Sequence, residues 1–214
     1  MKRMILIIFV LIIAILALIG FVIEPNRLGV KTYNIKQPKL KGIKVVFVSD
    51  FHVSPFQKKR LIRVVNLVNK QKPDLILSAG DFVYGYKTSD TLPIDEIAQE
   101  VAKMKSKYGI YAVLGNHDWM QGGRTIEKTL EKHGINVLGN ENVIVDLGGK
   151  KLHLAGVEDI TTRNIDLVKA LNNVTSPSIL LTHSPDVFPF ITKPENKKLT
   201  DVVDLTLAGH THGG

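Results

Sequence analysis

The stretch Val113–Asp118, with the sequence VLGNHD, is the part of the chain that best indicates its fold. An apolar run stops at a glycine, and three polar side chains that can bind a metal or move a proton follow at once: Asn116, His117 and Asp118. Taken alone, the stretch fits equally well a strand that runs into an ordinary Asn/Asp turn. The same arrangement recurs four more times along the chain, so one explanation is needed for all five.

The other four apolar runs also end in Asp or His. They are Val45–Ser49 before Asp50 and His52, Asp74–Ala79 before Asp81, Ile179–Thr182 before His183, and Val203–Ala208 before His210 and His212. Short apolar runs bounded by glycine and polar residues are typical of buried strands. In open α/β sheets, ligands bind beyond the carboxyl ends of the strands. We therefore expect five strands that bring Asp, Asn and His side chains to one edge.

Helical and strand patterns alternate along the rest of the chain. Apolar residues at helical spacing predict helices at 58–71, 94–102, 124–132 and 165–171. Two short apolar runs, 143–145 and 152–155, flank a turn rich in glycine and predict a β-hairpin. This alternation, with one hairpin, predicts an α/β domain with a mixed sheet.

The composition is that of a globular domain. The chain has 214 residues, of which 44% are hydrophobic, enough for one domain with a real core and too many for a disordered chain. It contains no cysteine, which excludes disulfides, thiolate metal ligands and a cysteine nucleophile. The redox compartment stays undecided.

Residues 4–23 form an apolar run without a charge. At about 1.5 Å per residue, such a run spans roughly the 30 Å of a bilayer's hydrocarbon core. It is too long for the apolar part of a cleaved signal peptide. It also has no polar face, which argues against a helix of a protein core. We therefore expect an uncleaved transmembrane anchor at 1–24, a basic juxtamembrane linker at 25–42, and a globular domain at 43–214.

The positive charge is concentrated next to the anchor. Residues 1–44 hold eight Lys and Arg against Glu24 alone, a net +7 of the chain's total of +8. A basic segment beside a membrane helix is attracted to anionic lipid headgroups. The nearly neutral remainder lacks the basic face of a nucleic-acid-binding domain, so no nucleic-acid partner is expected.

The orientation of this single-pass protein in the cell membrane is left open. Lys2 and Arg3 precede the helix, whereas five basic residues lie between Arg27 and Lys41, which by the positive-inside rule would keep the large domain in the cytoplasm. Yet Met-Lys-Arg followed by an apolar run is also typical of an export signal-anchor.

The polar residues at the strand ends are suited to metal binding. Five of the seven histidines belong to this set, and His133 and His153 lie outside it. Asp, Asn and His supply oxygen and nitrogen ligands for Mn²⁺, Zn²⁺ or Fe. The set is large enough for two divalent ions that share one carboxylate, an arrangement that can clamp both oxygens of a phosphoryl displacement.

Together, the motifs closely resemble those of the calcineurin-like metallophosphoesterases. They are Asp50-x-His52, Gly80-Asp81, Gly115-Asn116-His117-Asp118, His183 and Gly209-His210-Thr211-His212, in the family's order over residues 43–214. The prelude Glu24-Pro25-x-x-Leu28 resembles the membrane-anchored bacterial branch, which includes phosphodiesterases and hydrolases similar to UDP-2,3-diacylglucosamine pyrophosphatase. The resemblance implies a four-layer αββα sandwich of two mixed sheets.

The resemblance also implies a role for each residue of the set. The first metal would be held by Asp50, His52 and His212. The second would be held by Asn116, His183 and His210. Asp81 would bridge the two ions together with a hydroxide, which would attack the phosphorus. The catalytic residues would be His117, which stabilises or protonates the leaving oxygen, and Asp118, a candidate to orient His117.

The sequence departs from the family pattern in two places. Protein serine/threonine phosphatases continue the Gly-Asp motif with Asp-Arg-Gly, whereas this chain has Phe82-Val83-Tyr84-Gly85. The resemblance therefore argues against a protein phosphatase. The chain also stops at Gly214, two residues after the last motif, so we expect C-terminal strands to be missing from it.

The function expected from these features is a membrane-anchored phosphoesterase with two metals. It would hydrolyse a phosphodiester or pyrophosphate bond, on a lipid-linked or envelope-precursor substrate of the kind met in lipid A biosynthesis. One alternative is a non-catalytic membrane-bound metal-binding module, which would have no need of His117. Another is a nuclease of the same superfamily, which the near-neutral domain disfavours. The oligomeric state and the native metals are left open.

Overall fold

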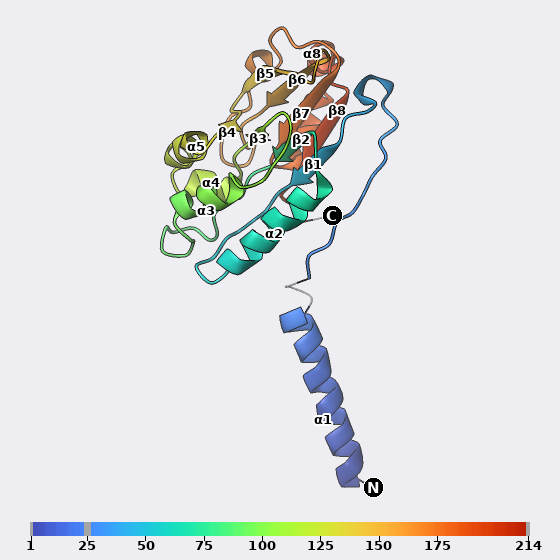
Figure 1. Cartoon of the computed structure of the whole chain (residues 1–214), viewed down its shortest axis with the longest axis vertical. Coiled ribbons are helices and arrows are strands. Elements are labelled where there is room, and N and C mark those ends of the chain that lie inside the picture. The colour runs from blue at the N-terminus through green and yellow to red at the C-terminus, as the bar shows by residue number, and fades with distance from the viewer. Residues whose placement is uncertain (1, 24–26, 213–214) are drawn as a thin grey trace. The chain divides into compact units, whose positions relative to one another are not determined.

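The chain forms two units, Met1–Asn34 and Ile35–Gly214, in a computed structural model that describes residues 2–23 and 27–212 (Figure 1). Glu24 and Pro25, which carry the resemblance to the membrane-anchored branch, lie outside the described residues, as does Gly214. The two units are described separately.

The first unit is built on one apolar helix. Helix α1 (Lys2–Leu18) continues into a π-helical turn, η1 (Ile19–Ile23). In the part of the chain that the structure describes, this is the one helix long and apolar enough to cross a membrane, by length and composition. The helix has no polar face, which suits the interior of a bilayer better than a site on the surface of a protein core.

The first sheet of the second unit is parallel throughout. Its strands, in spatial order, are β1 (Val45–Val48), β2 (Leu75–Ser78), β3 (Ile110–Ala112) and β4 (Ile135–Val137). Parallel neighbours require crossover connections, and these contain α2 (Lys58–Gln71), α3 (Ile94–Val101), α4 (Asn116–Met120) and α5 (Gly123–Lys132). The register pairs Val48 with Ser78 and Ser78 with Ala112, so the carboxyl ends of the strands lie level.

The second sheet is mixed. Its order is β5 (Glu141–Asp146), β6 (Lys151–Gly156), β7 (Ser178–Thr182) and β8 (Leu205–Ala208). The β5–β6 pair is antiparallel, which confirms the predicted hairpin, and the other pairs are parallel. The expectation of two mixed sheets therefore holds for this sheet, whereas the first lacks an antiparallel strand among its named strands. The short helices of this half are α6 (Leu167–Ala170), η4 (Pro185–Val187), α7 (Phe188–Ile191) and α8 (Pro194–Thr200).

The predicted four layers are confirmed by the way the strands divide their side chains. In β2, Leu75 and Leu77 pack between the two sheets, whereas Ile76 packs with residues of α2, α3 and α5. In β7, Leu181 packs between the sheets, whereas Leu180 packs with residues of α6 and α7. Because neighbouring side chains of a strand point to opposite faces, each sheet has a helical layer outside and the other sheet inside.

The expected linker at 25–42 is only partly a linker, because its second half packs on the globular unit. Residues Pro38–Leu40 form a short 3-10 turn, η3, and Leu40 packs against the core between the sheets. The Lys39 ammonium lies 3.2 Å from a carboxylate oxygen of Asp204. Gln37 Nε2 donates a hydrogen bond to the Asp204 carbonyl. These contacts involve residues far apart in sequence, which a composition-based boundary does not detect.

Candidate metal centre

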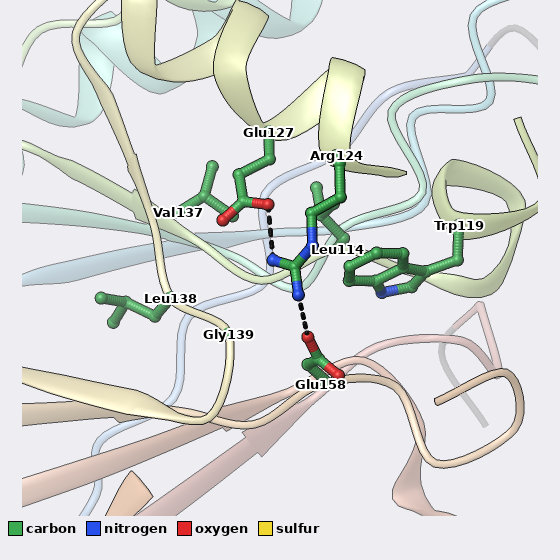
Figure 2. Close-up of a pocket in the computed structure, with 8 residues that line it drawn as sticks. All are labelled: Leu114, Trp119, Arg124, Glu127, Val137, Leu138, Gly139 and Glu158. Atoms are coloured by element: carbon green, nitrogen blue, oxygen red, sulfur yellow. Dashed lines mark hydrogen bonds and ion pairs between the residues drawn. The ribbon is translucent and has the colours of Figure 1, made fainter. Parts of the chain in front are cut away.

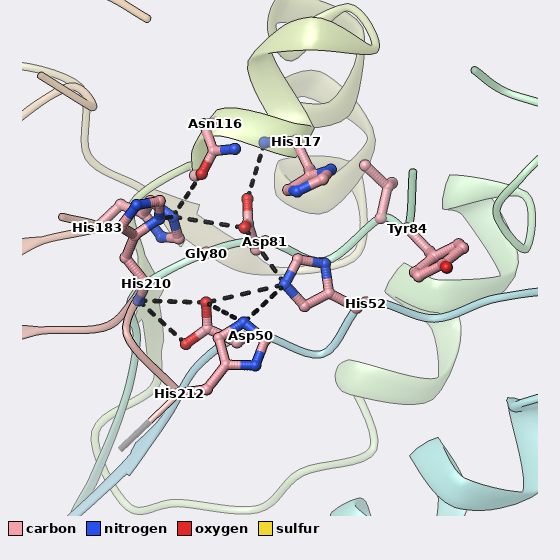
Figure 3. Close-up of polar contacts among 12 residues, drawn as sticks. Asp50, His52, Gly80, Asp81, Tyr84, Asn116, His117, His183, His210 and His212 are labelled. Carbon is pink, nitrogen blue, oxygen red and sulfur yellow. Dashed lines mark hydrogen bonds and ion pairs between the residues drawn. The ribbon is translucent and has the colours of Figure 1, made fainter. Parts of the chain in front are cut away.

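The site residues leave their strands through an unusual backbone conformation. Five of them have a positive φ: Asp50 (55°), His52 (42°), Asp81 (54°), His210 (68°) and His212 (54°). Such residues are uncommon outside glycine, although Asp and His tolerate the conformation better than most. Each costs on the order of 1–3 kcal/mol, and such residues cluster at functional sites. The turns aim side chains from separate strands toward one centre, which Figure 3 shows.

Four residues form a group that we call the inner group: Asp81, Asn116, His183 and His210. The His183 side chain is fully buried, and its Nδ1 lies 2.7 Å from the Ala79 carbonyl oxygen. Because a carbonyl only accepts, Nδ1 carries the proton and Nε2 presents a lone pair. That lone pair faces Asn116 Oδ1 at 3.0 Å, His210 Nδ1 at 3.0 Å and Asp81 Oδ2 at 3.4 Å.

Three residues form the outer group: Asp50, His52 and His212. The Nε2 atoms of His52 and His212 lie 3.2 Å apart. Asp50 Oδ1 lies 4.0 Å from His52 Nε2 and 3.7 Å from His212 Nε2. The Asp50 carboxylate also accepts the backbone N–H of His210, which joins the edge of one sheet to the edge of the other. Within this group the His212 side chain is 61% exposed, whereas those of Asp50 and His52 are 9% and 17% exposed.

Asp81, a member of the inner group, also reaches the outer group. Its Oδ2 is 3.4 Å from His183 Nε2 and 3.5 Å from His52 Nε2, while its Oδ1 accepts the backbone N–H of His117 at 2.9 Å. Burial, and then the neighbouring charge of Asp118, raise the pKa of Asp81 to about 8. A carboxylate in such a position needs a cation to remain charged at neutral pH.

The donor set fits divalent cations. With Asp81 ionised, the inner group directs an imidazole lone pair, an amide oxygen and a carboxylate oxygen at one another, and none of these three atoms then has a proton to share. Such a convergence of acceptors is unfavourable without a cation between them. Carboxylate, amide and imidazole ligands suit the borderline divalent metals. The absence of a side chain at Gly115 makes space for the Asp81 carboxylate, because a Cβ there would lie 2.2 Å from Asp81 Oδ1.

His117 lies beside the two groups. Its ring centroid is 4.8 Å from that of His52 and 5.1 Å from that of Tyr86. Its Nδ1 lies 2.7 Å from the Gly85 carbonyl oxygen. By distance, His117 could also join His52 and Asp81 around an ion.

Asp118 does not have the orienting role that the sequence suggested. Its buried carboxylate accepts four backbone N–H groups, those of Asp81, Phe82, Val83 and Gly115, at 2.8 to 3.1 Å. Burial raises the pKa of Asp118 to about 6, against the lowering effect of these hydrogen bonds. The side chain therefore ties the loop after β2 to the start of α4, and the His117 ring is oriented by Gly85 instead.

One acidic residue near the site was missed from the sequence. Asp159 is fully buried beyond the end of β6, and its negative charge helps to raise the pKa of Asp81. Its Oδ2 accepts hydrogen bonds from the hydroxyls of Thr161 and Thr162. The signal was present: the run 152–157 ends in Glu158-Asp159, as the five motif strands end in Asp or His.

A small pocket lies against α5, with Trp119 of α4 at its side (Figure 2). Arg124 crosses it, pairing with Glu127 at 2.8 Å and with Glu158 at 3.1 Å. The guanidinium groups of Arg124 and Arg163 lie 5.1 and 4.7 Å from the Trp119 ring centroid. The charge of Arg124 is thus paired with two carboxylates, whereas the buried Trp119 Nε1 finds no hydrogen-bond partner among the described residues.

Comparison with known proteins identifies relatives along nearly the whole chain. An uncharacterized metallophosphoesterase of Aquifex aeolicus is 33% identical over 204 residues, which cover 90% of this chain and 72% of the relative. A transmembrane protein with metallophosphoesterase domain from Danio rerio is 30% identical over 220 residues, which cover 95% of this chain and 48% of the relative. The chain thus spans about half the length of some of these relatives.

A solved structure, the phosphopantetheinyl hydrolase of Mycobacterium tuberculosis, is 14% identical with a TM-score of 0.44. The match covers 79% of this chain and 83% of that one, and at this TM-score nothing further follows from it. The family match is more informative, since it spans residues 43–214 and therefore every motif at the strand ends. The chain belongs to the calcineurin-like phosphoesterase family.

Proposed function

We propose that this chain is a membrane-anchored phosphoesterase with two divalent ions, which hydrolyses a phosphodiester or pyrophosphate bond. Asp50, His52 and His212 would hold one ion, and Asn116, His183 and His210 the other. The position of Asp81 Oδ2, within 3.5 Å of both His52 Nε2 and His183 Nε2, is the observation that carries the proposal. One charged oxygen within reach of both groups favours a bridged pair over two independent sites.

When bound, Mn²⁺, Zn²⁺ or Fe would polarise the phosphoryl oxygens and lower the pKa of a nucleophilic water. The remaining tasks fall to the chain itself. His117 carries its Nδ1 proton toward Gly85, which leaves Nε2 for the substrate, where it would stabilise or protonate the leaving oxygen. Asp118 would support the reaction at a distance, because its four backbone contacts hold Asp81 and the start of α4 together.

The proposal extends to a membrane-borne substrate. The apolar helix within residues 1–24 would anchor the chain, the first half of the expected linker 25–42 would connect it, and residues 43–214, with the packed second half of 25–42, would form the catalytic domain. The Danio rerio relative, a transmembrane protein by name, supports such an anchor. A tethered site meets membrane-borne substrates at a high effective concentration. Lys31 and Lys36, both exposed, would contact anionic headgroups. We propose a lipid-linked or envelope-precursor phosphate ester as the substrate.

Two assays test these proposals separately. The Mn²⁺-loaded protein is presented with mono-, di- and pyrophosphate esters, and we expect turnover of the latter two classes. Metal binding without turnover of any ester would instead support a non-catalytic metal-binding module. A second assay compares the full chain with a form lacking residues 1–24. We expect equal rates on a soluble chromogenic diester but a lower rate of the shortened form on a vesicle-borne substrate. Unchanged relative rates would contradict the lipid-linked substrate.

A further inference from the structure

Residue Gln121 contacts the same carbonyl group as the His117 ring. The Gly85 carbonyl oxygen accepts the Nδ1–H of His117 at 2.7 Å and an Nε2–H of Gln121 at 2.9 Å. The two side chains stand four residues apart at α4, a spacing that places them on one helix face. Gln121 Nε2 also donates to the Tyr84 carbonyl at 2.7 Å. Gln121 thus donates a hydrogen bond to the same carbonyl oxygen that accepts from the His117 ring.

The orientation of the Gln121 amide is settled by its partners. Both nearby carbonyls are acceptors, so a flipped amide would bring oxygen against oxygen at hydrogen-bonding distance. In the orientation observed, the buried Oε1 finds no hydrogen-bond partner among the described residues. A buried acceptor without a partner costs about 1–3 kcal/mol. Packing alone does not explain why the chain keeps an amide here, and such exceptions are concentrated at functional sites.

Asp90 holds the residues that follow Gly85 in the same loop. Asp90 Oδ2 accepts the backbone N–H groups of Tyr86 at 3.4 Å and Lys87 at 3.2 Å. Gly85 has φ +73°, and a Cβ there would lie 2.7 Å from the Asp90 Cβ. The carbonyl is therefore held between Asp90 and Gln121, in a conformation that favours glycine.

We propose that Gln121 is a positioning residue for His117, which acts through the Gly85 carbonyl. The proposal rests on the proposed function, in which His117 Nε2 serves the leaving oxygen. A fixed acceptor at Nδ1 keeps the proton on that nitrogen and sets the plane of the ring. Without the Gln121 amide, the carbonyl is free to turn, and both the tautomer and the direction of Nε2 become variable. A neutral carbonyl, held by an amide, thus takes the place of a carboxylate partner.

The test compares leaving groups, using Gln121→Met, which keeps the side-chain length but removes the donor. On a diester with a poor, alkoxide leaving group we expect kcat to fall about 10- to 100-fold, the cost of a misplaced acid. On bis(p-nitrophenyl) phosphate, whose leaving group needs little protonation, the loss should be at most a few-fold. KM and metal content should be unchanged. Gln71→Met is a matched control, because Gln71 Nε2 donates to the Leu67 carbonyl within α2, a helix that carries none of the site residues.

A double-mutant cycle separates positioning from a general structural effect. If Gln121 acts through His117, Gln121→Met should cause no further loss in a His117→Ala background. An equal fold-loss in both backgrounds would overturn the proposal. Should Gln121→Met not fold, Asp90→Ala on the exposed loop disturbs the same carbonyl, and it should show the same dependence on the leaving group and the same absence of effect without His117. Equal losses on both esters from Asp90→Ala would overturn the proposal too.

The cycle also distinguishes this inference from the proposed function. Wild-type protein without turnover, or His117→Ala with wild-type turnover, would contradict the function itself. Loss of turnover in His117→Ala together with wild-type rates in Gln121→Met on both esters would overturn only the role of Gln121.

Discussion

The inner and outer groups of the site use the same kinds of side chain but differ in how firmly the fold holds them. In the inner group, His183 is fully buried and its Nδ1 is fixed by the Ala79 carbonyl. In the outer group, His212 is 61% exposed and its neighbour His52 is 17% exposed. A hydrogen-bond partner that fixes the ring of a metal-binding histidine raises the affinity for the metal. The fold therefore fixes the ring of His183 more firmly than that of His212.

The largest expected effect comes from the residue that the two groups share. Asp81→Asn removes the charge between His52 and His183, so both ions should be lost together and turnover with them. The affinity loss should exceed the roughly 10–100-fold that follows when a residue hydrogen-bonded to a metal ligand is removed. Metal content per chain, measured after dialysis against Mn²⁺, checks this. Retention of two ions per chain by Asp81→Asn would contradict a shared carboxylate.

A folding control accompanies this variant. The metal-free form of Asp81→Asn should melt no lower than metal-free wild type, because a buried carboxylate has been replaced by a neutral amide of the same shape. A lower melting temperature would mean that loss of metal reflects loss of structure.

The next prediction compares one histidine of each group. His183→Ala leaves a buried cavity and removes the hydrogen bond to the Ala79 carbonyl, so metal-free protein should lose about 2–4 kcal/mol of unfolding free energy. His212→Ala, at an exposed position, should change it by less than about 0.5 kcal/mol. Urea unfolding in EDTA measures both. Equal destabilisation by the two changes would remove the distinction between the inner and outer groups.

The sequence was sufficient to predict where the site would form. Level strand ends place Asp50 and Asp81 at one edge of the first sheet and His183 and His210 at one edge of the second, because β1 is parallel to β2 and β7 is parallel to β8. The pattern of apolar runs also predicted α2, α3, α5 and α6 to within about two residues, but not α4, α7 or α8. These features depend on short-range periodicity, which a single sequence records.

The contacts that orient the side chains could not be predicted in this way. Asp118 was expected beside His117, yet its carboxylate turns to backbone N–H groups of the loop after β2. The partner of His117 is instead a carbonyl of Gly85, and a carbonyl belongs to every residue and leaves no mark in the sequence. Likewise, the contact between Lys39 and Asp204 joins residues whose neighbourhood only the folded chain creates.

The smallest expected effect concerns pH and again separates the two groups. In the metal-free protein, burial raises the pKa of Asp81 from 3.8 to about 8, while burial and the charge of His117 lower the pKa of His52 from 6.5 to about 4. Below pH 6.5 the two shifts oppose each other. Folded Asp81 holds a proton that the unfolded chain has lost, whereas folded His52 lacks a proton that the unfolded chain keeps.

Between pH 6.5 and 8, only the raised pKa of Asp81 still affects stability, and the folded chain binds more protons than the unfolded one. The free energy of unfolding therefore falls as the pH rises through this window. The loss is at most about 2 kcal/mol, or a few degrees in melting temperature. Thermal melts in EDTA at pH 6.5 and 8 measure it, with Asp81→Asn as the control that should lack it. Saturating Mn²⁺ should abolish the loss, since an ion then replaces the proton on Asp81. A metal-free wild type that becomes more stable from pH 6.5 to 8 would show that Asp81 is ionised without a metal, and that the inner group needs no cation to keep its charge.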